Sequence, residues 1–195
     1  SKGWRVLATA FRQISPEEMR NSPLEEMDEN LTFTGLVALK DPVRKEVREA
    51  IEECRDGGIK VIFATGDHKL TAQAVAEELG FKIEEKDILS GEELGKLSET
   101  ELEKIIGDIK LYYRVEPEQK LKIVSAWQKK GEVVAMTGDG VNDAPALKKA
   151  DIGVVLGSGT EVAKETADLV LLNDSFAIIT AAVKEGRTII DNIRK

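Results

Sequence analysis

Short apolar runs alternate with amphipathic stretches over most of this 195-residue chain. The apolar runs are nearly continuous, as in strands buried on both faces of a sheet, and they fall at 59–64, 111–114, 133–136, 152–156 and 169–172. The stretches between them have helical spacing. Because strand and helix alternate with crossovers long enough for parallel pairing, the pattern predicts an α/β fold with a three-layer, Rossmann-like parallel sheet.

Helix starts and stops are marked by local chemistry. An apolar stripe begins at Val43 and ends at Gly57-Gly58, and Pro117 begins another helix. Residues 81–110 are less regular and predict one or two short charged helices, the second starting at Ser98. A long apolar-striped helix is expected from Phe176 to the end of the printed sequence.

The first 40 residues have a different pattern. Apolar runs predict strands at 4–10 and 31–39, with a short helix starting at Ser15-Pro16 between them. Proline disfavours helix in the residue before it, so Asp41-Pro42 interrupts the chain, and we place a domain boundary near Lys40–Pro42.

Composition excludes several classes of function. A formal charge of −8 argues against a nucleic-acid partner, which needs clustered positive charge. The single cysteine, Cys54, lies on an apolar helix stripe, so it predicts core packing and excludes an internal disulfide. No apolar run approaches the roughly 20 residues of a membrane helix, and no signal peptide is visible. The chain is expected to be soluble and to be a piece of something longer.

The loop after the run at 133–136 has the densest chemistry. Residues 137–145 read Thr-Gly-Asp-Gly-Val-Asn-Asp-Ala-Pro, with Asp139 and Asp143 between a strand and a helix. Glycines let the backbone approach a phosphate, and two carboxylates suit Mg²⁺, which also takes water and substrate oxygens. Asn142 can offer an amide contact to a phosphoryl oxygen. A turn with solvated acids is the alternative interpretation.

Other strand ends are expected to converge on this loop, because parallel strands place their carboxyl ends on one edge. Thr65 and the Gly66 amide follow one strand and can hold phosphoryl oxygens. Lys120, in the first turns of a helix, offers a point positive charge, although such a lysine is usually solvated. Phosphoryl transfer needs this kind of positioning and charge neutralisation. His68, the only histidine, is given no role.

The nine residues 137–145 resemble the signature of the P-type ion-pumping ATPases, within the haloacid dehalogenase superfamily. The resemblance runs through the whole chain in order, and its further motifs are residues 41–44 (Asp-Pro-Val-Arg), 65–67 (Thr-Gly-Asp), 114–120 (Arg-Val-Glu-Pro-Glu-Gln-Lys) and 159–164 (Gly-Thr-Glu-Val-Ala-Lys). The pattern is most similar to type II, calcium-pump-like members.

The resemblance implies roles for individual positions. Asp139 and Asp143 match the Mg²⁺-site acids, and Lys120 matches the lysine that steadies the transferred phosphoryl group. With Thr65 they make up the implied catalytic set. Positions that match ATP contacts are Arg5, Thr65, Gly66, Asp67, Arg114, Lys120 and Asn142. The implied cofactors are Mg²⁺ and ATP.

The resemblance also divides the chain. It implies the tail of a nucleotide-binding domain at 1–40, the second segment of a phosphorylation domain at 41–174, and a stalk-like helix leading towards the membrane at 175–195. Such a segment lies on the cytoplasmic face, attached to an integral membrane parent. The implied parent is an ATP-driven cation pump, and the similarity to calcium-pump-like members favours calcium as its ion.

Three departures qualify the match. Val43 stands where many relatives have a second hinge proline, and His68 where many have asparagine. The family's phosphate-accepting aspartate lies in an Asp-Lys-Thr-Gly-Thr motif, which does not occur in this sequence. This chain alone is therefore expected to be inactive, with a sheet that lacks the nucleophile-bearing strand unless another polypeptide supplies it. A soluble phosphatase and a non-catalytic nucleotide- or Mg²⁺-binding module remain alternatives.

Overall fold

The computed structural model describes residues 4–21, 29–39, 42–172 and 174–194. Two compact units divide the chain, Ser1–Pro42 and Val43–Lys195, and each is described by itself. The expected hinge at Asp41-Pro42 falls partly outside the described residues. The functional assignment of segments 1–40, 41–174 and 175–195 stays a prediction.

The first unit is a β-hairpin with a short helix. Strands β1 (Arg5–Phe11) and β2 (Thr32–Leu39) pair antiparallel, with an irregularity in register at Thr9/Ala10. Helix α1 (Pro16–Asn21) lies between them in the chain. Large apolar side chains on this hairpin are exposed, including Phe33 and Leu36, and no apolar side chain is buried among the described residues of this unit. The hairpin therefore has no core of its own.

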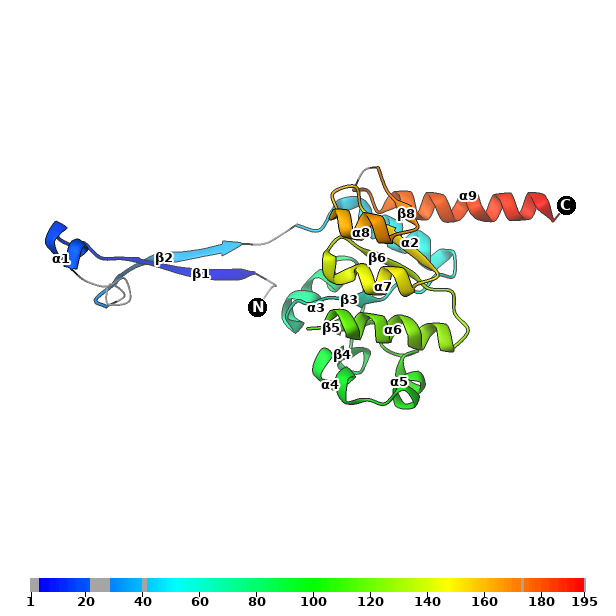
Figure 1. Ribbon diagram of the computed structural model, residues 1–195, viewed down its shortest axis with the longest axis horizontal. Helices are drawn as coiled ribbons and strands as arrows, with labels where there is room; N and C mark the ends of the chain where they lie inside the picture. The colour runs from blue at the N-terminus through cyan, green and yellow to red at the C-terminus, as the bar shows by residue number, and fades with distance from the viewer. Residues whose placement is uncertain (1–3, 22–28, 40–41, 173, 195) are drawn as a thin grey trace. The chain divides into compact units, whose positions relative to one another are not determined.

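The described residues of the second unit form six strands, paired in parallel in two separate sheets. The first sheet has the order β3 (Phe63–Ala64), β5 (Leu111–Tyr113), β4 (Ile88–Ser90). The second has the order β6 (Ala135–Gly138), β7 (Ile152–Val155), β8 (Leu169–Val170). In Figure 1, β8 and β4 lie at the outer sides of this unit, with β6 and β3 between them.

The expectation of an α/β fold with parallel strands is confirmed, but a single continuous sheet is not present in the described part of the chain. Strands β3 and β6 are each paired on one side only, to β5 and β7. The strand predicted at 59–64 is correspondingly short, since only Phe63 and Ala64 have a ladder partner.

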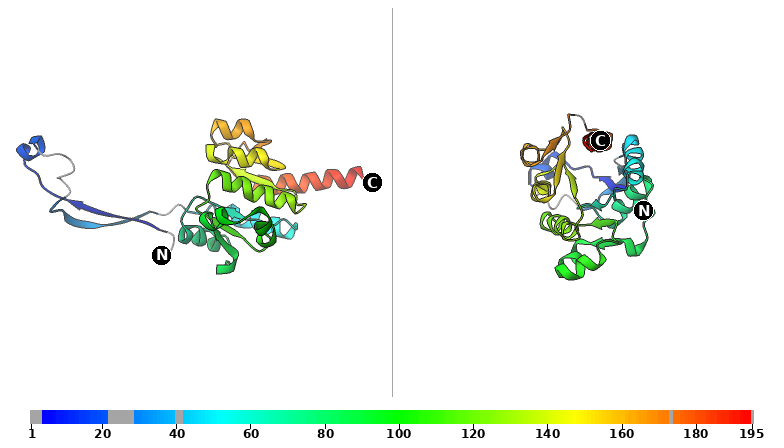
Figure 2. Two further views of the ribbon diagram at one scale, coloured as in Figure 1. Left: turned by 60° about the horizontal axis from the view of Figure 1, so that its bottom comes forward. Right: turned by 90° about the vertical axis from the view of Figure 1, so that its right-hand side faces the viewer.

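Helices follow the strands in the predicted alternation. Their bounds are α2 (Lys45–Asp56), α3 (Lys69–Glu78), α4 (Gly91–Lys96), α5 (Glu99–Ile105), α6 (Pro117–Lys129), α7 (Ala144–Lys149), α8 (Glu161–Thr166) and α9 (Ala177–Ile193), with short 3-10 helices η2 (Glu85–Asp87) and η3 (Val141–Asp143). Helices α6, α7 and α8 stack in succession, as the left view of Figure 2 shows in green, yellow and orange.

Helices cover both faces of the first sheet. Successive residues of a strand point to opposite faces. In β5, Leu111 packs in a cluster with Ala72 of α3, whereas Tyr112 packs with Ile123 of α6. Both strand residues are completely buried. This arrangement gives the three layers that the apolar strand pattern predicts.

Local signals located several elements correctly. Ser98 accepts a hydrogen bond from the Glu101 N–H and begins α5 with a capping box. Cys54 is buried on α2, as its place on the apolar stripe predicts. The strand β4 was missed, because a three-residue strand is too short for its periodicity to be recognised.

Candidate phosphoryl site

The loop after β6 folds back on itself. The Asp143 side chain is buried, and its Oδ2 accepts a hydrogen bond from the Gly140 N–H at 3.3 Å. A Cβ at Gly138 would lie 2.5 Å from the Asp143 Cβ, so only glycine fits there. Gly138 therefore allows the loop to bring the second carboxylate close to the end of β6.

Asp139 is placed by the backbone of a second loop. Its carbonyl oxygen accepts a hydrogen bond from the Thr160 N–H at 2.9 Å. Thr160 in turn caps α8, where its Oγ1 accepts from the Ala163 N–H. The sequence motif at 159–164 thus holds the loop of Asp139, a role that the sequence pattern alone did not indicate. The Asp139 residue itself is exposed.

Lys120 reaches the same loop from α6. Its Nζ lies 2.6 Å from the Asp143 Oδ1. The two side chains are 15% and 10% exposed, so this ion pair is largely shielded from water. The predicted approach of Lys120 to the loop is observed, and its observed partner is the Asp143 carboxylate.

A second cluster forms at the end of β3. The Thr65 N–H donates to the Tyr112 carbonyl at 3.0 Å, and the Thr65 carbonyl accepts from the Val115 N–H at 3.1 Å. The Thr65 Oγ1 accepts from the Asp67 N–H, while the Asp67 carbonyl accepts from the Arg114 N–H. The motif at 65–67 is therefore fastened to Arg114, as expected for neighbouring strand ends.

Arg114 has an unusual backbone. Its φ is 50°, in the left-handed region that non-glycine residues seldom adopt. Its Nη2 lies 2.9 Å from the His68 Nδ1, so the histidine that the sequence gave no role contacts a predicted site residue. Strained residues of this kind cluster at ligand sites, which supports the choice of Arg114.

The structure does not join the two clusters directly. Among the described residues, no hydrogen bond or ion pair connects Thr65, Gly66 or Asp67 with Asp139, Asp143 or Lys120. Asn142 is exposed on η3. The side chain of Arg5 lies outside the described part. The predicted residues thus appear as two half-clusters, one at the end of β3 and one at the end of β6.

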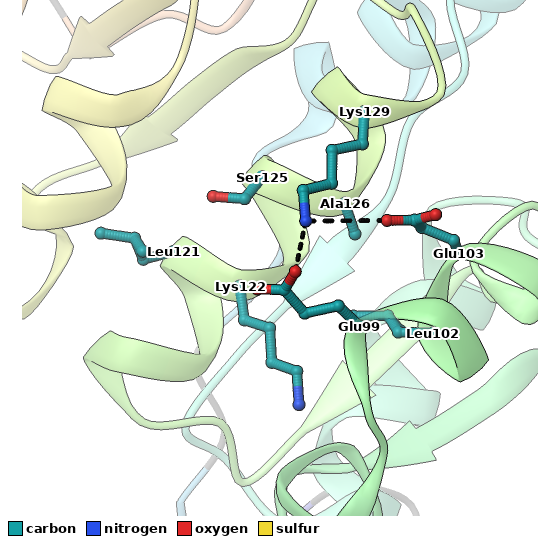
Figure 3. Close-up of a pocket in the computed structure, with 8 residues that line it drawn as sticks. All are labelled: Glu99, Leu102, Glu103, Leu121, Lys122, Ser125, Ala126 and Lys129. Carbon is teal, nitrogen blue, oxygen red and sulfur yellow. Dashed lines mark hydrogen bonds and ion pairs between the residues drawn. The ribbon is translucent and has the colours of Figure 1, made fainter.

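A pocket lies between α5 and α6 (Figure 3), and none of the predicted site residues is among the described residues that line it. Its volume is about 130 Å³, and its charged groups already have partners. Lys129 forms ion pairs with Glu99 and Glu103, and Lys122 donates to the carbonyls of Leu94 and Leu97. The described residues that line this pocket leave no charge unpaired for a ligand, so the strand ends remain the candidate site.

A family model described as a haloacid dehalogenase-like hydrolase matches residues 4–151. The chain belongs to the haloacid dehalogenase-like hydrolases. The loop of Asp139 and Asp143 and the helix that carries Lys120 both lie inside the range matched by this family model.

Relatives of this haloacid dehalogenase-like chain are named as calcium-transporting ATPases or calcium ATPases. It is 50% identical to a calcium-transporting ATPase of Bacillus subtilis over 196 residues, covering 100% of this chain and 22% of that protein. It is 48% identical to a calcium-transporting ATPase of Listeria monocytogenes, covering 98% of this chain and 22% of that protein. It is 44% identical to an endoplasmic reticulum calcium ATPase of Aspergillus fumigatus, covering 100% of this chain and 21% of that protein. The chain spans about a fifth of these relatives.

Two further observations concern metal and membrane. Within the described ranges, no group of three or more histidine, cysteine or acidic side chains is arranged so that it could hold a metal ion. Those ranges also contain no helix that is long and apolar enough to cross a membrane.

Proposed function

We propose that this chain is part of an ATP-driven cation pump that couples ATP hydrolysis, through an aspartyl phosphate, to ion transport. In this proposal the chain supplies the Mg²⁺ site and part of the ATP and phosphoryl site. The supporting observation is the shielded Lys120–Asp143 ion pair at the end of β6, beside the exposed Asp139. A fixed cation next to two carboxylates matches the charge pattern that phosphoryl transfer requires.

The loop after β6 has a donor set that fits Mg²⁺. Mg²⁺ takes one or two protein carboxylates and completes its shell with water and phosphate oxygens. Asp139 is exposed and accessible, and Asp143 is fixed by Gly140 and Lys120. When bound, the ion would neutralise negative charge on the phosphoryl group. Asp139 and Asp143 would hold it, while the Lys120 ammonium would orient the Asp143 carboxylate.

The end of β3 supplies the second half of the site. Thr65 and Gly66 would contact ATP or the phosphoryl oxygens through the Thr65 hydroxyl and the Gly66 N–H, because the N–H groups of Thr65 and Asp67 are already donated to the Tyr112 carbonyl and the Thr65 Oγ1. Asp67 is proposed as a further nucleotide contact. Arg114, held beside them by its N–H bond to Asp67, would contribute a guanidinium for nucleotide oxygens. Asn142 and Arg5 are proposed as further nucleotide contacts.

The nucleophile would come from a strand between β3 and β6. Each of these two strands has one unpaired edge in the described structure, and Thr65 and Asp139 follow their carboxyl ends. A parallel strand between them would satisfy the backbone groups of both edges and place its own carboxyl end between the two half-clusters. The missing Asp-Lys-Thr-Gly-Thr motif belongs at that position.

The proposed ion is calcium, because the relatives in three organisms are named calcium-transporting ATPases or calcium ATPases. The parent would be an integral membrane protein, with this segment on its cytoplasmic face. The remaining parts of the pump are the proposed partners, and this chain alone is proposed to be inactive.

Phosphoenzyme formation from radiolabelled ATP in the full parent pump tests the proposal. Asp139→Asn removes one carboxylate charge from the Mg²⁺ site, and we expect the phosphoenzyme level to fall at least about 100-fold. Asp108→Asn is the matched control, since Asp108 is an exposed aspartate in the turn after α5. The control should retain the phosphoenzyme.

Two outcomes of the same assay would contradict the proposal. A normal phosphoenzyme level in a folded Asp139→Asn pump would refute the site assignment. Phosphoenzyme on the isolated 195-residue chain would refute the proposal that its nucleophile comes from elsewhere.

A further inference from the structure

A second pocket lies at the opposite end of the first sheet. Its volume is about 400 Å³, and its lining residues are Arg55, Lys60, Val61, Gly80, Phe81, Lys82 and Lys110. Lys60 and Val61 precede β3 and Lys110 precedes β5, whereas Thr65 and Arg114 follow the carboxyl ends of these two strands. The pocket is therefore separate from the candidate phosphoryl site.

The pocket is strongly basic in an acidic protein. Of the seven described residues that line it, four are cationic and none is acidic, although the chain carries a formal charge of −8. Arg55, Lys60 and Lys82 form no ion pair among the described residues. Lys110 pairs with Asp87 at 2.9 Å. An excess of positive charge thus faces one concave surface.

Two of the cations are held by aromatic rings. The Arg55 guanidinium carbon lies 4.0 Å from the centroid of the Phe81 ring, and Phe81 is fixed in turn by an edge-to-face contact with Phe63. Lys60 donates to the Gly107 carbonyl, and its Nζ lies 5.0 Å from the Trp127 ring centroid. Holding Arg55 in advance reduces the entropy lost when a ligand binds.

We propose that this basic pocket binds a phosphate-bearing ligand. The planar guanidinium of Arg55 can contact two phosphate oxygens at once, and Lys82 adds a mobile point charge. Lys60 and Lys110, already positioned by other contacts, supply the surrounding positive potential. Val61 offers an apolar contact for the carbon portion of the ligand. The phosphate belongs either to a small soluble ester or to a lipid headgroup.

Binding by the 195-residue chain can be measured by amide NMR during titration with inorganic phosphate and with glycerol 3-phosphate. We expect saturable shifts at Gly80, Phe81 and Lys82, with dissociation constants on the order of millimolar. The double variant Arg55→Gln/Lys82→Gln should weaken binding about tenfold or more through lost charge-assisted hydrogen bonds. The control Lys45→Gln/Lys104→Gln changes the net charge equally at exposed lysines outside the pocket and should bind like the wild type.

A vesicle arm separates the two sources of phosphate. Co-sedimentation with phosphatidylcholine vesicles containing phosphatidic acid, compared with phosphatidylcholine alone, measures headgroup binding. Retention that requires phosphatidic acid and is lost in the double variant assigns the pocket to lipid headgroups. Binding of glycerol 3-phosphate without vesicle retention assigns it to soluble esters.

Two results would overturn the proposal. One is the absence of saturable shifts at the pocket together with no vesicle retention. The other is binding that the double variant, folded by its amide spectrum, leaves as tight as in the wild type. Either result would show that these cations are a solvated surface.

Discussion

The Lys120 Nζ lies 2.6 Å from the Asp143 Oδ1. This ion pair joins α6, which packs on the first sheet, to the loop that follows β6 of the second sheet. Both side chains are mostly shielded from water. Removing one partner leaves an uncompensated buried charge, which is costly. We expect Lys120→Met to lower the free energy of unfolding by about 2 to 4 kcal/mol in urea titrations.

The pair can be tested by a double-mutant cycle. Lys120→Met/Asp143→Asn should lose less stability than the sum of the two single variants, because neither charge is then left alone. Lys148→Met, at an exposed lysine of α7, controls for the loss of a lysine. Strict additivity in the cycle would contradict a direct interaction.

Gly91, at the start of α4, is predicted to tolerate no side chain. A Cβ there would lie 2.1 Å from the Arg114 carbonyl oxygen and 2.6 Å from the Gln119 Oε1. We expect Gly91→Ala to cost about 1 to 3 kcal/mol, measured by thermal or urea unfolding. At Gly95, in the same helix, a Cβ would meet only the Gln119 Nε2 at 3.5 Å. Gly95→Ala should be neutral or stabilising by up to about 1 kcal/mol, and equal losses at both positions would contradict the steric argument.

The backbone of Arg114 gives a matched pair of variants. At its φ of 50° an alanine remains strained, whereas a glycine does not. Both substitutions remove the contact with His68, so that loss cancels in the comparison. We expect Arg114→Gly to be more stable than Arg114→Ala by about 1 kcal/mol in urea unfolding. Equal stability of the two would show that no strain is stored there.

Asp87 predicts a dependence of stability on pH. Hydrogen bonds from the Lys110 ammonium and from the Glu84 N–H hold the pKa of Asp87 below its ordinary value. A lowered folded-state pKa adds stability above the unfolded pKa of about 4, and this stability is lost as pH falls through the folded pKa. Asp87→Asn should therefore be less stable than the wild type near pH 7, and the difference should shrink below about pH 4.

Urea titrations at a series of pH values measure this difference. Asp108→Asn, at an exposed aspartate with no ion pair among the described residues, is the control and should change stability little. A difference for Asp87→Asn that grows towards acid pH would have the wrong sign and would contradict the proposed role of Lys110.

The alternation of elements and the chemistry of the loop at 137–145 are determined by the sequence. Apolar runs and helix caps act over a few residues, so α5 could be located from Ser98 and Glu101 alone. The fold-back of the loop is also local, since Gly140 and Asp143 are three positions apart. For this reason the α/β class and the candidate carboxylates could be predicted without coordinates.

Contacts between distant segments were decided by the tertiary structure. The ion pair of Lys120 with Asp143, the contact of Arg114 with His68, and the gathering of Arg55, Lys60, Lys82 and Lys110 join residues far apart in the chain. The division into two sheets also depends on packing, because the pairing of an edge such as β3 or β6 is set by which strands lie beside it. Sequence patterns give the faces of strands and helices, whereas side-chain partners depend on how those faces are brought together.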